Sequence, residues 1–158
     1  MAQDIFLKLN GIDGESQDAM HLNEIDITTW TWQISQDSAM LSGSGGGAGK
    51  STVGDLTLTH NVDRSSPNLA KYCFTGKHID QAILTMRKAG GTPFEYARIT
   101  MSDVIISHFS PLVSGALSQE NFRLSFARMK YEYMLQNALG GSGGVVTALI
   151  DVKENRSS

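Results

Sequence analysis

The glycine-rich run from Ser44 to Ser51 is the stretch that most resembles a ligand-binding motif. Its residues, Ser-Gly-Gly-Gly-Ala-Gly-Lys-Ser, resemble a phosphate-binding P-loop, in which backbone amides surround the phosphates and the lysine reaches the terminal ones. However, Ser44 stands where the motif has its first glycine, and the residues that follow alternate as in a strand where a helix is required. We therefore interpret this run as a flexible loop and keep nucleotide binding as an alternative.

A second run, Gly140 to Gly144, fits the Gly-x-Ser-x-Gly pattern of serine hydrolases. That chemistry needs a sharp turn from a strand to a helix at the serine, followed along the chain by an acid and a histidine. Here the last histidine, His108, precedes Ser142, and no helical pattern follows the run. The order differs from that of the α/β-hydrolases, so we interpret the run as a linker, predict no catalytic residue and expect no enzyme.

The four histidines show no spacing typical of a metal site. None of them forms a His-x3-His pair or a His-Glu-x-x-His motif. His21 lies near Asp13, Glu15 and Asp18 and could form an acidic site with them, but a hydrogen-bonded turn is the preferred interpretation. The histidines His21, His60, His78 and His108 are therefore expected to be structural, with no metal and no cofactor.

Segments in which apolar and polar residues alternate recur along the whole chain, as expected of half-buried strands in an all-β domain. Clear examples are residues 5–9, 25–34, 56–62, 122–133 and 145–152. A single helix start is indicated, with Ser66 as the cap, Pro67 at the first helical position and Gly76 at the end. Periodicity alone leaves Ile79 to Lys88 open, because its apolar residues fit either a helix or a strand.

Two long strands change the face on which their apolar residues lie. In one the change occurs at Asp103, and in the other it predicts a bulge or a corner near Ala127-Arg128. Long, bent strands of this kind build barrels. The sequence therefore predicts an all-β fold with one short helix.

Trp30, Trp32 and Ile34 alternate with polar residues, which predicts that they share a buried face of one strand. The opposite face carries Thr29, Thr31 and Gln33, and this polar row must meet solvent or a wet interior.

Composition restricts the class of protein further. The 158 residues, 41% hydrophobic and 18% charged, predict one globular domain over 1–158, with glycine-rich loops at about 43–50 and 140–144 and a polar tail at 153–158. A net charge of -3 argues against a nucleic-acid partner, and the apolar runs are too short to cross a membrane. The single Cys73 cannot form an internal disulfide, and the first residues lack the pattern of a signal peptide.

A set of short motifs resembles the hemolysin-coregulated proteins (Hcp) of bacterial type VI secretion. They span Ala2 to about Tyr133, which is nearly the whole domain, and in combination they are far more specific than the two catalytic patterns. The matching residues are Gly14-Glu15-Ser16, Asp18, His21, Glu24-Ile25, Trp30-Thr31-Trp32, Gly43 to Lys50, Ser66-Pro67-Asn68-Leu69, Gly76-Lys77-His78 and Arg87-Lys88-Ala89-Gly90.

The resemblance implies a two-sheet β-barrel like that of phage tail-tube proteins, with residues 79–88 as a strand. It implies that six copies form a ring and that rings stack into a tube inside a contractile sheath, with spike and baseplate proteins as further partners. The protein would assemble in the bacterial cytoplasm, be expelled without a signal peptide and carry small effectors in the lumen. The alternative from another class is a stand-alone secreted binding module.

Two sets of residues receive roles within this interpretation. The polar row Thr29, Thr31 and Gln33 is expected to line the lumen and contact effectors. The glycine-rich loop is expected to contact a neighbouring ring or the sheath. Its residues are Ser44, Gly45, Gly46, Gly47, Ala48, Gly49 and Lys50.

Overall fold

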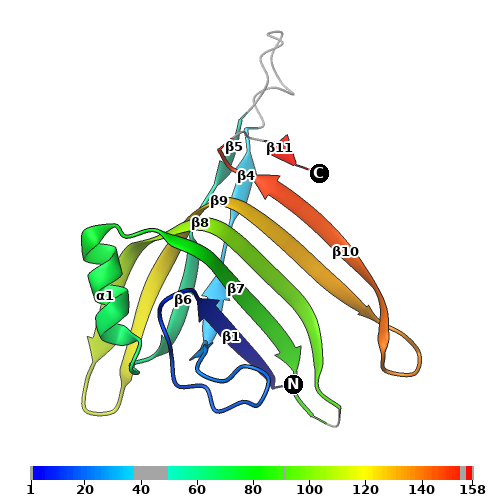
Figure 1. The fold of residues 1–158 in the computed structure, drawn as a ribbon, viewed down its shortest axis with the longest axis horizontal. Coiled ribbons are helices and arrows are strands. Elements are labelled where there is room, and N and C mark those ends of the chain that lie inside the picture. Colours follow the sequence, from blue (N-terminus) through cyan, green and yellow to red (C-terminus); the bar gives the residue numbers. More distant parts are fainter. Residues whose placement is uncertain (1, 38–49, 91, 154–155, 158) are drawn as a thin grey trace.

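The computed structural model describes residues 2–37, 50–90, 92–153 and 156–157, which form strands and one short helix. This confirms the predicted mostly-β fold (Figure 1). The elements are β1 (Gln3–Leu9), β2 (Ile25–Asp26), β3 (Thr29–Thr31), β4 (Ile34–Gln36), β5 (Ser51–Val53), β6 (Leu56–Asn61), α1 (Ser66–Thr75), β7 (Ile79–Lys88), β8 (Phe94–Val113), β9 (Ser118–Gln136), β10 (Ser142–Asp151) and β11 (Arg156–Ser157).

Hydrogen bonds connect most strands in a circuit. Strands β1, β7, β8 and β9 pair in that order, and the first half of β9 pairs with β6. The segment 25–31 closes the circuit, because it pairs with β1 through β2 and with β6 through β3. Between these pairings, the Ile27 amide donates to Ile5 and the Thr28 amide donates to Thr59. The apolar core lies inside this circuit, with Leu7, Leu58 and Ile99 fully buried.

Strands β8 and β9 turn a corner together. Ser102 pairs with Arg128 and Val104 pairs with Phe126, so the register is the same on both sides of Asp103 and Ala127. Asp103 has a φ of 53°, in the left-handed region that few residues other than glycine adopt. Both strands therefore change face at the same place, and the predicted alternative of a bulge or a corner is resolved as a corner.

Helix α1 differs from the prediction at its start. Ser65, not Ser66, occupies the cap position, and the Ser66 hydroxyl donates instead to the Glu120 carboxylate at 2.6 Å. The predicted end is confirmed, because Gly76 has a φ of 67° and its amide donates to the Tyr72 carbonyl. The ambiguous segment after the helix is strand β7, because hydrogen bonds to β1 and β8 hold it extended along its length.

Two other expectations need correction. Trp30 and Trp32 pack against the core but are only half-buried, and Ile34 is 47% exposed because β4 leaves the main sheet to pair with β5. The expected loop at 140–144 is partly strand, since β10 begins at Ser142. Asn137 orders the preceding turn, because its side-chain oxygen accepts hydrogen bonds from the amides of Leu139 and Gly141.

The long segment between β1 and β2 folds back over the outer side of the sheet, and Gly14 fixes its path. The amide of Gly14 donates to the Asn23 carbonyl at 2.7 Å, and that of Ser16 donates to the Glu24 carbonyl at 2.9 Å. A Cβ atom on Gly14 would lie 2.6 Å from the Glu24 carbonyl oxygen and 2.7 Å from the Ile25 Cα. Only glycine fits between these backbone atoms.

We expect Gly14→Ala to lower the free energy of unfolding by about 1–3 kcal/mol, because the backbone must move to accommodate the methyl group. Urea denaturation followed by tryptophan fluorescence measures the change. Gly115→Ala is the control, since a Cβ there meets nothing within 4 Å. Equal stability of the two variants would contradict the close approach at Gly14.

Candidate functional site

The polar row predicted from sequence lies on an exposed polar face that extends over several strands. Thr29 and Thr31 are exposed on β3 and pair with Thr59 and Thr57 of β6. The same two threonines of β6 pair with Asn121 and Arg123 of β9. This surface, defined here as the threonine face, is therefore built mainly of hydroxyl and amide groups.

An open depression of about 330 Å³ lies at one end of the threonine face. Trp32 forms part of its wall and is fixed there, because its indole N–H donates to the Gly54 carbonyl at 2.9 Å. The charged residues of its lining are Asp55 and Arg123. The Asp55 carboxylate already accepts a hydrogen bond from the Ser107 hydroxyl at 2.6 Å. The lining residues are Thr31, Trp32, Gln33, Gly54, Asp55, Thr57 and Arg123.

This depression can form hydrogen bonds, but it contains no nucleophile paired with a base. Its hydroxyls belong to threonines in neighbouring strands, and its lining contains no histidine. In the part of the chain that the structure describes, no cluster of three or more His, Cys, Asp or Glu side chains could hold a metal. The arrangement therefore suits reversible contact with another molecule and gives no basis for a reaction.

The structure also gives the surroundings of the two catalytic patterns. Residues 44–49 of the P-loop-like run lie outside the described residues, whereas Lys50 is exposed and is followed by strand β5. Strand β10 contains Ser142 and continues beyond the Gly-x-Ser-x-Gly run. A strand thus follows each run, where both catalytic motifs need a helix.

Two histidines are buried and hold elements of the fold together. His60 donates or accepts at Nε2 toward Glu120 Oε1, at 2.7 Å, and Ser66 donates to the same oxygen, which ties β6, β9 and the start of α1 together. The ring of His21 stacks on Phe6, with centroids 4.3 Å apart. Its two nitrogens lie 3.0 Å from Glu24 and 2.9 Å from Glu95.

Sequence reasoning missed a surface on the β9–β10 hairpin. Both sides of β10 are exposed, with Val145 at 52% and the next residue, Val146, at 60%. Only the last two residues of β10 pair with β11, so no strand among the described residues pairs with its outer edge over residues 142–149 (Figure 1). The sequence indicated this surface, because Val145 and Val146 are consecutive apolar residues, and such residues are typical of a strand that is covered on both faces.

Comparison with known proteins identifies the family. The family model described as "Type VI secretion system effector, Hcp" matches residues 6–133. The chain is 43% identical to Protein hcp1 of Pseudomonas aeruginosa, over 98% of both chains. The chain belongs to the Hcp family.

Solved structures agree with this assignment. Hcp1 from Salmonella typhimurium is 48% identical, with a TM-score of 0.84 over the full length of both chains. A type VI secretion system effector from Yersinia pestis is 37% identical, with a TM-score of 0.79 over 94% of this chain and all of the other. Hcp proteins are type VI secretion proteins and not a family of enzymes.

In this Hcp chain, several of the residues that carried the resemblance form one ionic cluster. Arg87 donates to Asp18 at 2.6 Å and to Asp4 at 3.0 Å, and its guanidinium lies 4.9 Å from the centroid of the Phe6 ring. The cluster, with His21 beside it, fastens the folded-back loop to β1 and β7.

No helix among the described residues is long and apolar enough to cross a membrane.

The hydrogen bond from Arg87 holds the pKa of Asp18 at about 2, below its usual value of 3.8, and the same pair raises the pKa of Arg87. A carboxylate with a lowered pKa stabilises the fold above its unfolded pKa, and the contribution disappears as the pH falls through the folded pKa. We therefore expect the Asp18 contribution to be complete above about pH 4 and to decrease toward pH 2.

Asp18→Asn tests this expectation. Its urea midpoint should be lower than that of the parent at pH 6, and the difference should shrink between pH 4 and pH 2, as followed by circular dichroism. Asp80→Asn, at an exposed position near the start of β7, is the control. A difference that stays constant down to pH 2 would show that the charge of Asp18 does not contribute.

Proposed function

We propose that this Hcp chain is the structural subunit of a type VI secretion tube, in which six copies form a ring and rings stack into a hollow tube. The observation that carries the proposal is the exposed apolar surface of the β9–β10 hairpin. Burying a valine or leucine side chain contributes about 1.5–3 kcal/mol, so contact with another protein surface would stabilise this hairpin. Family membership makes a second copy the natural partner.

The geometry of the hairpin fits contacts between identical subunits. The exposed apolar side chains lie on one strand and its neighbour, at the margin of the sheet and not around a pocket. A surface that contacts a different surface on the next copy generates a ring when the rotation closes. The contributing side chains are Tyr133, Leu135, Val145, Val146 and Leu149.

Within this proposal, the threonine face lines the lumen and contacts effectors. Small neutral hydrogen-bonding groups bind weakly, and they present no large apolar patch to a passing protein. Thr29, Thr31 and Gln33 are exposed, as such a role requires.

Further contacts belong to the same proposal. The glycine-rich run from Ser44 to Lys50 would contact the next ring or the sheath, and spike and baseplate proteins would be partners during assembly. Sheath contraction would expel the tube from the cell, without a signal peptide. These roles follow from the family resemblance.

We expect Val146→Asp to convert a ring of six copies to monomers, because a carboxylate opposite Tyr133 on the exposed apolar hairpin would lose its hydration on assembly. Size-exclusion chromatography with light scattering measures the mass. Val113→Asp is the matched control, because Val113 is similarly exposed, at 65%, but lies at the far end of β8. A monomeric parent protein would favour the alternative of a stand-alone binding module.

The lumen assignment is tested by Thr31→Arg. We expect the ring to form and to be exported while the cellular level of effectors carried inside decreases, because a long charged side chain obstructs the polar surface. Immunoblots of effectors and light scattering of the purified ring report the two properties. Thr75→Arg, on α1, is the control. Loss of the ring in Thr31→Arg would place Thr31 at a contact between subunits.

A further inference from the structure

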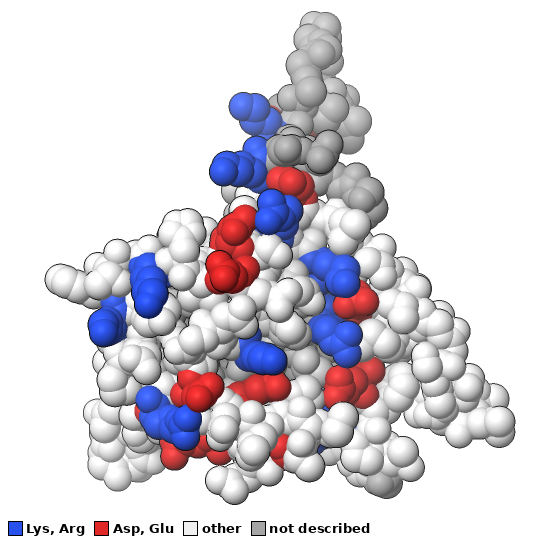
Figure 2. Space-filling model, viewed as in Figure 1, with Lys and Arg blue, Asp and Glu red and all other residues white. Residues whose placement is uncertain are grey.

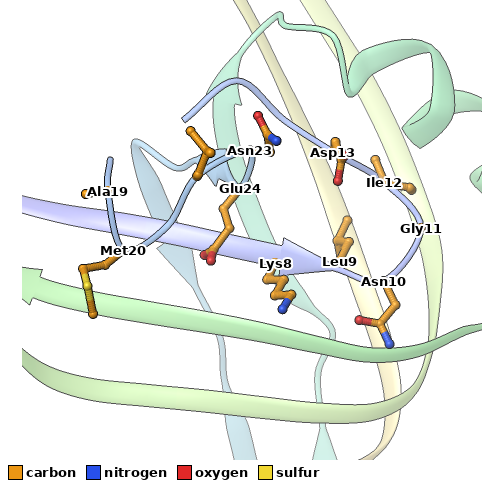
Figure 3. Close-up of a pocket in the computed structure, with 11 residues that line it drawn as sticks. Lys8, Leu9, Asn10, Gly11, Ile12, Asp13, Ala19, Met20, Asn23 and Glu24 are labelled. Carbon is orange, nitrogen blue, oxygen red and sulfur yellow. The ribbon is translucent and has the colours of Figure 1, made fainter. Parts of the chain in front are cut away.

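A pocket of about 470 Å³ lies beside the folded-back loop and shares no lining residue with the depression on the threonine face. Figure 3 shows its residues coming from the end of β1, the turn after it and the returning part of the loop. Buried Leu9 and Ile12 belong to its lining, and the volume is within the range of ligand pockets. The remaining lining residues are Lys8, Asn10, Gly11, Asp13, Ala19, Met20, Leu22, Asn23 and Glu24.

In the loop beside this pocket, a polar residue is buried and its two apolar neighbours are exposed. His21 is 7% exposed, whereas its neighbours Met20 and Leu22 are 75% and 61% exposed. The stack on Phe6 and the contacts with Glu24 and Glu95 fix His21 inward. With His21 held inward, Met20 and Leu22 on either side of it remain exposed at the pocket. Exposed large apolar side chains grouped at a cavity mark a contact site.

Around the pocket, the two acidic side chains have ionic partners among the described residues, whereas the lysine has none. Asp13 pairs with Arg64 at 3.1 Å, and Glu24 pairs with His21 at 3.0 Å. Lys8 is exposed and forms no ion pair with any residue that the structure describes. The side-chain amides of Asn10 and Asn23 likewise have no hydrogen-bond partner within the described ranges. Beside the two carboxylates, which are already paired, the polar side-chain groups without a described partner are one ammonium group and two amides.

We propose that this pocket binds a segment of a partner protein in which an aliphatic side chain stands next to a carboxylate. The aliphatic side chain would pack against Met20 and Leu22, and the carboxylate would pair with Lys8 and accept hydrogen bonds from the asparagine amides. The ionic cluster at Asp18 and Arg87 fixes the loop in advance, so binding requires little ordering. The proposal is independent of ring formation and of the threonine face.

The test uses three acetylated peptides, Ser-Leu-Asp-Leu-Ser, its Lys-for-Asp counterpart and Ser-Ser-Asp-Ser-Ser. The protein is labelled with ¹³C at its methionine methyl groups, and Met20→Leu assigns the Met20 signal among the seven methionines. We expect the first peptide alone to shift the Met20 signal in a saturable way. The signals of buried Met86, Met101 and Met129 should stay in place.

Variants separate the two parts of the site. Lys8→Glu and Leu22→Ser should each weaken binding of the first peptide about five- to tenfold or more, because each removes one class of contact. The matched controls are Lys71→Glu and Leu112→Ser, which change exposed residues elsewhere and should bind as the parent does. Circular dichroism verifies that every variant is folded.

Three results would overturn the proposal. The first is the absence of any Met20 shift, and the second is equal binding of the Asp and Lys peptides. The third is a decrease in oligomer mass in Leu22→Ser, measured by light scattering, because it would show that a second copy of this chain covers the pocket. A failure of ring formation in the parent protein would leave the two peptide readouts unchanged and would remove only the third.

Discussion

The pairing of β8 with β9 is the constraint on which the rest of the structure depends. These strands are the longest, and they pair from Ala97–Tyr133 at one end to Val113–Ser118 at the other. Every other part of the circuit is attached to them, with β7 on the free edge of β8 and β6 and β10 on successive halves of β9. The corner at Asp103 and Ala127 therefore decides which residues of the two strands face the core, since the buried positions change from Ile99 and Met101 to Val104 and Ile106 across it.

The consequences of the corner differ on its two sides. Before it, the side of β9 that faces away from the core carries Asn121 and Arg123 next to the threonines of β6. Beyond it, β9 pairs with β10, whose residues 142–149 are exposed among the described parts of the chain. The polar face and the apolar surface thus both include β9, on opposite sides of the corner.

The folded-back loop depends on a different kind of interaction. Its backbone closes on itself through Gly14, while Arg87, Asp18 and His21 attach it to the sheet through charged hydrogen bonds and stacking. Hydrogen bonds between charged groups are directional, so they fix orientation as well as position. Such a loop can hold apolar side chains in water, which apolar packing alone would not do.

The sequence by itself determined the class of fold and the family. Alternation of apolar residues depends on the two-residue period of a strand, and the stop at Gly76 depends on a local conformation that glycine adopts, so both can be read without neighbours. The change of phase at Asp103 was also visible. The polar character of Thr29, Thr31 and Gln33 followed from the same alternation.

Only the tertiary structure decided which of these features come together. Residues 79–88 fit two periods, and hydrogen bonds from β1 and β8, distant in the chain, made them a strand. Ser65 and not Ser66 occupies the cap position, and the Ser66 hydroxyl donates a hydrogen bond to Glu120, 54 residues away. The partners of His21 include Glu95, which no local pattern indicates. Contacts between distant residues depend on how strands pair, and one sequence does not contain that pairing in any local period.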